Sequence, residues 1–200
     1  MPAYRASRPN QIRDPAMRRY LSDNPLAHGG DFFKKSGGRK RRYISEAGSM
    51  NLTLRSTQAR REWSFRNERN WRAINAITAK FAERFGVEVL RVSNVGNHLH
   101  FHVIFPSKKA YVKFIRALTS AIAHAITGCS RWTKGLPTPF WDQRPFTRPI
   151  QGAIQFLHYD EYLDLNDLEG EGYPRVAARA LMKLRKLFRG GIDLTKWRPA

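Results

Sequence analysis

Cysteine is almost absent from this sequence of 200 residues, in which Cys129 is the only example. A single cysteine excludes an internal disulfide framework and a cysteine-ligated zinc finger. Long apolar runs are also absent, since no stretch approaches the roughly 18 residues that a transmembrane helix needs. The first residues lack the apolar segment of a signal peptide. The sequence therefore predicts a cytoplasmic protein that has no membrane partner.

Acidic residues are scarce, and this imbalance indicates a class of partner. The chain has 36 Lys and Arg against 16 Asp and Glu, which gives a formal net charge of +20. Such a surface attracts polyanions, of which nucleic acid is the commonest in the cytoplasm. Phosphate contacts provide affinity without sequence information, so the charge alone leaves a ribosome-like or merely soluble basic protein open.

Basic residues are prominent in the segments at both ends of the chain. Residues 1–45 are polar with scattered Pro and Gly, which predicts a loosely ordered basic arm. Residues 170–200 are predicted to form a basic helical extension, with a helix over 174–189. Each segment could contact DNA or could simply be solvated. The candidate DNA contacts in these two segments are Lys34, Lys35, Arg39, Lys40, Arg41, Arg42, Arg179, Lys183 and Lys186.

Hydrophobic periodicity divides the central segment, 46–169, into strands and helices. Alternating apolar residues predict strands, which cover 50–55, 87–92 and 97–104. Helical spacing predicts helices, which cover 67–85, 106–127 and 150–168. Residues 129–149 contain four prolines and are predicted to be a loop.

Aromatic and basic side chains alternate within the predicted loop. The cations are Arg131, Lys134, Arg144 and Arg148. Such a mixture can stack on unpaired bases and bind phosphates. The alternative, which we prefer, is that the loop packs on the core through its aromatic residues, which are Trp132, Phe140, Trp141 and Phe146.

The strand over 97–104 carries the strongest chemical signal, because histidine alternates with apolar residues. Successive side chains of a strand point to opposite faces. Leu99 and its apolar neighbours can therefore be buried, while His98, His100 and His102 share the other face. Several imidazoles on a rigid strand are a common support for a divalent metal.

The helix over 150–168 carries a second group of polar residues. Tyr162 and Asn166 are four residues apart and share a helical face, with His158 one turn earlier. If this helix packs near the histidine strand, Asn166 could complete a metal site with His98 and His100, and Tyr162 would lie beside the metal. Such a site suits phosphodiester cleavage by a tyrosine nucleophile. Open coordination positions favour Mg²⁺ or Mn²⁺, although imidazole also favours Zn²⁺.

Three segments together resemble one family, the single-tyrosine HUH transposases with their REP-associated branch (IS200-like transposases). Gly96-Asn97-His98-Leu99-His100 resembles the family's His-hydrophobe-His motif. Phe140 to Phe146 resembles its Trp-Gln-x-x-Phe stretch, and Tyr162 to Asn166 resembles its Tyr-Ile-x-x-Asn motif. The resemblance extends over residues 46–169, with the three motifs in the family's order.

The resemblance implies an α+β fold, with a ferredoxin-like antiparallel sheet and helices on one face (the HUH endonuclease fold). It also implies Mg²⁺ or Mn²⁺ and a transposase that nicks and transfers single-stranded, hairpin or palindromic DNA through a 5′-phosphotyrosine. Carried over by position, Tyr162 is the nucleophile, and His98, His100 and Asn166 are the metal ligands.

The sequence departs from the family pattern at two positions. Asp167 stands where the family often has Pro, which puts the end of the catalytic helix in question. His102 stands where an apolar residue is usual, and we interpret it as structural. Tyr159 is a competing nucleophile, but Leu163, four residues later, cannot bind a metal.

Two other functions stay open, and the sequence does not decide between a monomer and a homodimer. One is a non-catalytic, domesticated protein that binds DNA or RNA through the same charges. The other is a zinc hydrolase that uses His98, His100 and His102. A long distance between Tyr162 and the histidines would favour the binding protein, and zinc bound by the three histidines without Asn166 would favour the hydrolase.

Overall fold

The computed structural model describes residues 44–46, 48–129 and 136–187, together with Pro15, Arg19 and Asp23. The strands in these ranges are β1 (Ser49–Arg55), β2 (Glu88–Asn94), β3 (His98–Ile104) and β4 (Phe146–Pro149). The longer helices are α3 (Glu68–Phe85), α4 (Lys108–Thr127), α5 (Gly152–Gly170) and α6 (Arg175–Leu187). None of these helices combines the length and the hydrophobicity needed to cross a membrane.

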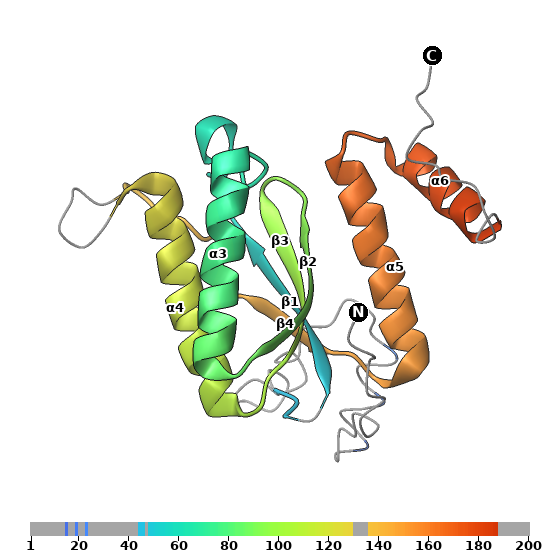
Figure 1. Cartoon of the computed structure of the whole chain (residues 1–200), viewed down its shortest axis with the longest axis horizontal. Helices are drawn as coiled ribbons and strands as arrows, with labels where there is room; N and C mark the ends of the chain where they lie inside the picture. The colour runs from blue at the N-terminus through green and yellow to red at the C-terminus, as the bar shows by residue number, and fades with distance from the viewer. Residues whose placement is uncertain are drawn as a thin grey trace.

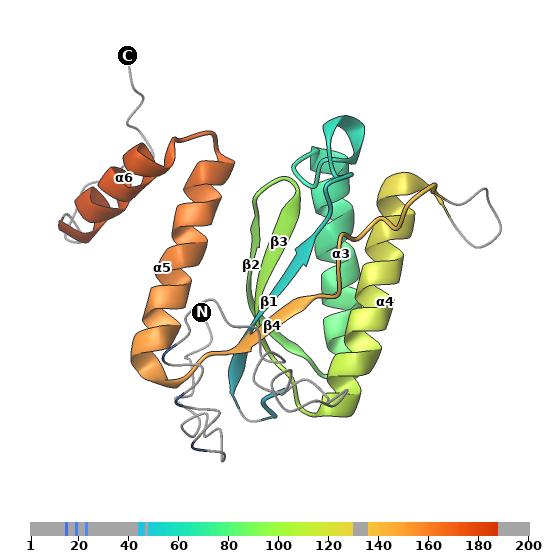
Figure 2. The same ribbon diagram turned by 180° about the vertical axis from the view of Figure 1, so that it is seen from behind.

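The strands form one antiparallel sheet in the order β2-β3-β1-β4. With α3 after β1 and α4 after β3, this is the β-α-β-β-α-β connection of a ferredoxin-like fold, so the predicted α+β class is confirmed. Helices α3 and α4 lie side by side on one face (Figures 1 and 2). Helix α5 lies against the opposite face, and α6 packs on α5 (Figure 1).

The core lies between the sheet and the pair α3 and α4. Leu99, Phe101 and Val103 of β3 are fully buried there, as the alternation in the sequence predicts. The same face of β1 contributes Met50, Leu52 and Leu54, and the helices contribute Ile74, Phe114, Leu118 and Ile122. Because a shift of one residue would exchange the two faces of β3, this burial fixes which face carries the histidines.

The boundaries of α3 and α4 follow from residues that are visible in the sequence. The side chain of Asn67 accepts a hydrogen bond from the Arg69 amide, and Ser107 accepts one from the Ala110 amide. These are N-caps, which satisfy free amides in the first helical turn. Each helix ends at a glycine in the left-handed conformation, Gly86 with φ 62° and Gly128 with φ 70°.

The prediction of a loop over 129–149 is wrong at its end, where residues 146–149 form β4. This strand pairs with β1 from Met50↔Pro149 to Thr53↔Phe146. Pro149 at its end and Pro145 just before it hid the strand pattern, but proline is tolerated because β4 is an edge strand.

The aromatic residues before β4 support the preferred interpretation of this segment. Phe140 is 5% exposed, and its ring and that of Trp141 pack against Phe65 with centroid distances of 6.2 and 5.8 Å. Trp141 Nε1 donates a hydrogen bond to the carbonyl oxygen of Thr119 at 3.0 Å. These two aromatic side chains therefore attach the segment to the core rather than present themselves for base stacking.

Candidate active site

The face of the sheet opposite the core is polar along its central strands. The register of β1 and β3 pairs Arg55 with His98, Thr53 with His100 and Asn51 with His102. On the other side of β3, Ser93 pairs with His100 and Arg91 with His102. A row of histidines therefore runs between two strands that contribute polar side chains to the same face.

Helix α5 places Tyr162 directly against this row. The ring of Tyr162 meets the ring of His100 edge to face, with centroids 5.3 Å apart and planes at 87°. His98 and His100 are neighbours with ring centroids 4.9 Å apart. The condition that the helix packs near the histidine strand is thus met. Tyr162 is half-buried and lines a cavity of about 600 Å³ together with His100, Arg148 and His158.

Asn166 belongs to the same helix and is buried further along it. One turn before it, Tyr162 contacts His100, and one turn after it, Gly170 approaches Arg66 and the carbonyl oxygen of Asn94. Asn166 lies between these two contact points and is 2% exposed, and its Nδ2 has no hydrogen-bond partner in the described part of the chain. The helix therefore continues past Asp167, so this departure from the family pattern does not end it.

Buried polar atoms without partners are concentrated on this face. Among the described residues they are His100 Nε2, His102 Nε2, Ser93 Oγ and the Asn166 amide nitrogen. Unpaired buried polar groups are rare in proteins, and at a functional site such atoms are available to bind an ion, a water or a ligand. Ser93 was missed by the sequence analysis, and it could have been found only from its pairing with His100.

The protonation of the histidines fits a metal site. Burial lowers the pKa of His98, and burial together with the nearby His98 lowers the pKa of His100 to about 3. Both imidazoles are therefore neutral at pH 7, which is the form that binds metals. Two neutral imidazoles and an amide form a donor set that a divalent ion can accept.

His102 is set apart from these residues. Its ring packs against Phe156 and Tyr159, with centroid distances of 4.6 and 5.2 Å, and burial lowers its pKa to about 4. In the described part of the chain, no group of three or more His, Cys, Asp or Glu side chains could hold a metal. The described residues therefore give no support to a zinc hydrolase with three histidine ligands.

Tyr159 differs from Tyr162 in the environment of its hydroxyl. The Tyr159 hydroxyl donates a hydrogen bond to Asn51 Oδ1 at 2.7 Å and lies 3.4 Å from the carbonyl oxygen of Phe101. Burial raises its pKa well above the ordinary value. This hydroxyl is thus engaged in the structure and hard to ionise, which agrees with the preference for Tyr162.

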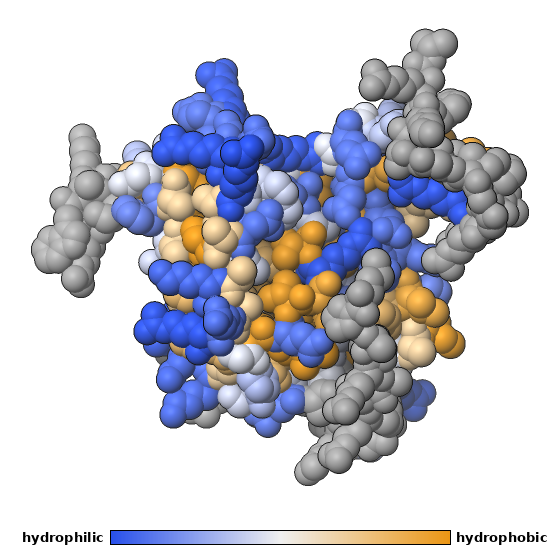
Figure 3. Space-filling model, viewed as in Figure 1, coloured by the Kyte–Doolittle hydropathy of each residue, from blue (hydrophilic) through white to orange (hydrophobic). Residues whose placement is uncertain are grey.

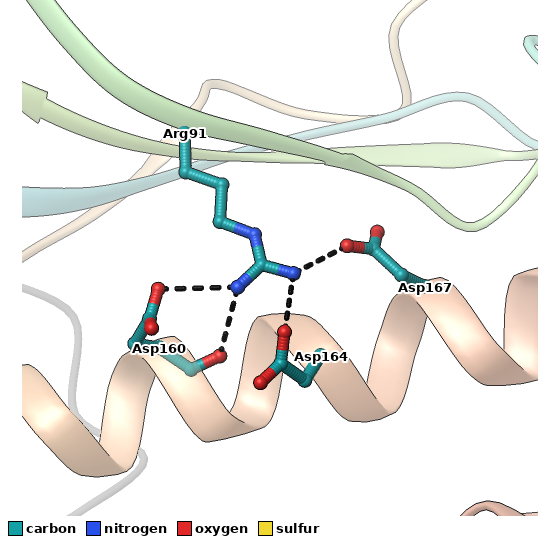
Figure 4. Close-up of polar contacts among 4 residues, drawn as sticks. All are labelled: Arg91, Asp160, Asp164 and Asp167. Atoms are coloured by element: carbon teal, nitrogen blue, oxygen red, sulfur yellow. Dashed lines mark hydrogen bonds and ion pairs between the residues drawn. The ribbon is translucent and has the colours of Figure 1, made fainter. Parts of the chain in front are cut away.

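Arg91 holds α5 against the sheet by three ion pairs (Figure 4). Its Nη1 lies 3.1 Å from Asp160, and its Nη2 lies 2.6 Å from both Asp164 and Asp167. Burial opposes the charge of Arg91, but the hydrogen bonds that it donates to Asp167 and Asp164 outweigh this effect and raise its pKa. This clamp was not predicted from the sequence. Its signal was an acidic residue on each successive turn of one helical face.

The predicted DNA-binding cations are only partly placed. Arg148 is half-buried in the cavity beside Tyr162, and burial lowers its pKa. Arg144, Arg179 and Lys183 are exposed. The remaining ones lie outside the described residues or, for Lys186, have no described side chain; they are Lys34, Lys35, Arg39, Lys40, Arg41, Arg42, Arg131 and Lys134.

The first turns of α5 are apolar where they face solvent. Figure 3 shows hydrophobic surface over this end of the helix, where Ile154 and Leu157 are 72% and 59% exposed. The neighbouring residues Gln155 and His158 line the cavity. The mouth of the cavity therefore has both apolar and polar surface beside it.

The chain matches one protein-family model and resembles solved structures. A model of the family "Transposase IS200 like" matches residues 51–165. A structure of a REP-associated tyrosine transposase bound to a REP hairpin superposes with a TM-score of 0.53 at 15% identity, covering 68% of this chain and 80% of that chain. A Deinococcus radiodurans protein assigned as a transposase gives a TM-score of 0.41 at 15% identity, covering 63% of this chain and 97% of that one. No curated protein matches the chain significantly.

Proposed function

Because the chain belongs to the IS200-like transposase family, we propose that it is a metal-dependent single-stranded DNA endonuclease and strand transferase. The nucleophile is Tyr162, and the observation that carries this assignment is its contact with His100 at the edge of an open cavity. The ring of the competing Tyr159 lies deeper, with its hydroxyl bonded to Asn51.

The proposed reaction is a transesterification. The Tyr162 oxygen attacks the phosphorus of a DNA phosphodiester and loses its proton, and a new bond forms between phosphorus and the tyrosine oxygen. The bond from phosphorus to the 3′ oxygen breaks, and this oxygen takes up a proton and leaves as a 3′ hydroxyl. The 5′-phosphotyrosine preserves the energy of the ester, so that another 3′ hydroxyl can attack it and rejoin the strands without ATP.

His98, His100 and Asn166 are the proposed ligands of Mg²⁺ or Mn²⁺. A bound divalent ion would stabilise the negative charge that develops on the phosphoryl oxygens. Neutral imidazoles and a buried amide are supplied by the protein before any ion arrives, as the lowered pKa values of His98 and His100 indicate. The contact between Tyr162 and His100 keeps the nucleophile next to this donor set.

Hairpin or palindromic DNA is the proposed substrate. The REP-associated transposase of similar fold was solved with a REP hairpin, and this chain carries a net charge of +20. Arg148 in the cavity is suited to the phosphate next to the cleaved bond, while Arg144, Arg179 and Lys183 are exposed for contacts with the backbone. The cations of residues 1–45 would add further contacts, and the proposed location is the cytoplasm.

Covalent capture of DNA tests the proposal. A labelled hairpin with single-stranded flanks is incubated with the full chain and Mn²⁺, and the adduct is separated on a denaturing gel. We expect an adduct with the wild type and none with Tyr162→Phe or in EDTA. Tyr159→Phe should reduce the adduct without abolishing it. Tyr173→Phe, a half-buried tyrosine between α5 and α6, is the matched control that should leave the adduct unchanged.

Two outcomes would change the assignment. A normal adduct with Tyr162→Phe would show that another residue is the nucleophile. Tight binding of the hairpin without any adduct, even with the wild type and metal, would support the alternative of a non-catalytic, domesticated protein that binds DNA or RNA.

A further inference from the structure

A chain of hydrogen bonds connects the proposed metal ligand His100 to β1 and α5. Thr53 is the cross-strand partner of His100, and its Oγ1 lies 3.1 Å from His100 Nδ1. The same Oγ1 lies 3.2 Å from Asn51 Oδ1. The Tyr159 hydroxyl on α5 donates to this Asn51 oxygen as well, at 2.7 Å.

The direction of each hydrogen bond follows from the number of protons available. Asn51 Oδ1 can only accept, so the single hydroxyl proton of Thr53 is donated to it. With its proton used, Thr53 Oγ1 can only accept from His100, and Nδ1 must therefore carry a proton. A neutral imidazole has one N–H, which leaves His100 Nε2 with a free lone pair. This Nε2 is one of the buried atoms that have no hydrogen-bond partner among the described residues.

Nδ1 of His98 also faces an oxygen acceptor, which here belongs to the neighbouring residue Asn97. The Nδ1 of His98 lies 2.7 Å from Oδ1 of Asn97, so the Nε2 of His98 is also left without a proton. Both histidines of the proposed site therefore have an oxygen acceptor on Nδ1. Acceptors of this kind fix the orientation and the tautomer of histidines that bind metals.

We propose that Thr53 and Asn51 are positioning residues that hold the proton of His100 on Nδ1 and so present Nε2 to the divalent ion. This inference rests on the proposed function, because it assumes that His100 is a ligand. Tyr159 completes the chain from α5, so the docking of the helix that carries Tyr162 and the tautomer of His100 are coupled through Asn51.

The tautomer can be measured without metal or DNA. In the full chain labelled with ¹⁵N-histidine, long-range ¹H–¹⁵N correlation spectra distinguish an Nδ1 proton from an Nε2 proton, and His100→Gln assigns the signals. We expect His100 to carry its proton on Nδ1 in the wild type. A proton on Nε2 would overturn the proposal. It would mean that Asn51 presents its NH₂ group to Thr53 and that the Thr53 hydroxyl donates to His100 Nδ1 instead of accepting from it.

The variants Thr53→Val and Thr53→Ser form a matched pair. Valine keeps the shape but removes the acceptor, whereas serine keeps the hydroxyl. We expect Thr53→Val to move His100 towards the Nε2 tautomer and to weaken Mn²⁺ binding by about 10–100-fold in calorimetric titration, while Thr53→Ser keeps both properties near the wild type. Unchanged tautomer and Mn²⁺ affinity in Thr53→Val would refute the inference.

The two proposals fail in different ways. If Tyr162→Phe still forms the DNA adduct, the nucleophile is wrong, but the tautomer and the effect of Thr53→Val stand. If Thr53→Val does not fold, two other measurements test the positioning of His100. One is the tautomer of His100 in the wild type, and the other is the Mn²⁺ affinity of Asn51→Leu, which removes the oxygen that accepts from Thr53.

Discussion

Loss of Arg91 should loosen the helix that carries Tyr162. Arg91→Ala removes the cation that three carboxylates of α5 share, at distances between 2.6 and 3.1 Å. It also leaves Asp160, Asp164 and Asp167 close together without the cation that they share. Helix α5 packs on the face of the sheet opposite α3 and α4. We therefore expect α5 to open locally while the sheet with α3 and α4 stays folded.

The burial of the partners sets the size of the effect. Exposed ion pairs contribute about 0–1 kcal/mol, whereas breaking a fully buried pair costs about 3–5 kcal/mol. The side chain of Arg91 is 26% exposed and those of its partners are 37–48% exposed, which places this cluster between the two limits. We therefore expect a loss of about 2 kcal/mol in the docking of α5, equivalent to a change of about 30-fold in the equilibrium.

Native-state hydrogen exchange measures this change for each amide. The amides of α5 in Arg91→Ala should exchange about 30-fold faster than in the wild type, and those of α4 should not change. Arg72→Ala is the matched control, because its ion pair with Glu68 on α3 is 77% and 79% exposed. Replacing the three aspartates by Asn in the Arg91→Ala background should recover part of the protection. Exchange of α5 within threefold of the wild type would refute the reasoning.

Two further predictions concern stability. Gly170→Ala should cost about 1 kcal/mol in urea unfolding, because a β-carbon there would lie 3.1 Å from the backbone oxygen of Asn94 and would displace the Arg66 guanidinium from its hydrogen bond to that oxygen; wild-type stability would contradict this. The metal-free protein should lose stability from about pH 6.5 towards pH 4, because the lowered pKa values of His98, His100 and His102 let the unfolded chain bind protons that the folded chain does not. Equal stability at pH 7.5 and 4.5 would contradict it.

Local patterns in the sequence were sufficient for most of the fold. The caps Asn67 and Ser107 and the glycines Gly86 and Gly128 mark the ends of α3 and α4, and the structure uses all of them. Strand β4 was not predicted, because a strand of four residues that ends in proline has no alternation to detect. Its formation depends on pairing with β1, which is a contact between residues almost a hundred positions apart.

Some residues of the candidate site could likewise be predicted from the sequence, and others could not. The motifs around His98 and Tyr162 could be found because each lies within one strand or one helical turn. Ser93 and Arg91 could not, since they acquire a role only when β2 pairs with β3 in one register and α5 docks across both. Prediction from the sequence therefore stopped at the residues of the motifs and missed the residues that hold them.

The polar residues of β1 show why the register matters for chemistry. Asn51, Thr53 and Arg55 are unremarkable as the exposed side of an amphipathic strand, and the sequence analysis used them only as such. Pairing with β3 places Thr53 against His100, and with one residue of slip the hydroxyl would face the core instead. The burial of Leu52 and Leu54 prevents that slip. The apolar face of β1 thus places the hydroxyl that we propose sets which nitrogen of His100 carries the proton, and this links the packing of the core to the proposed metal site.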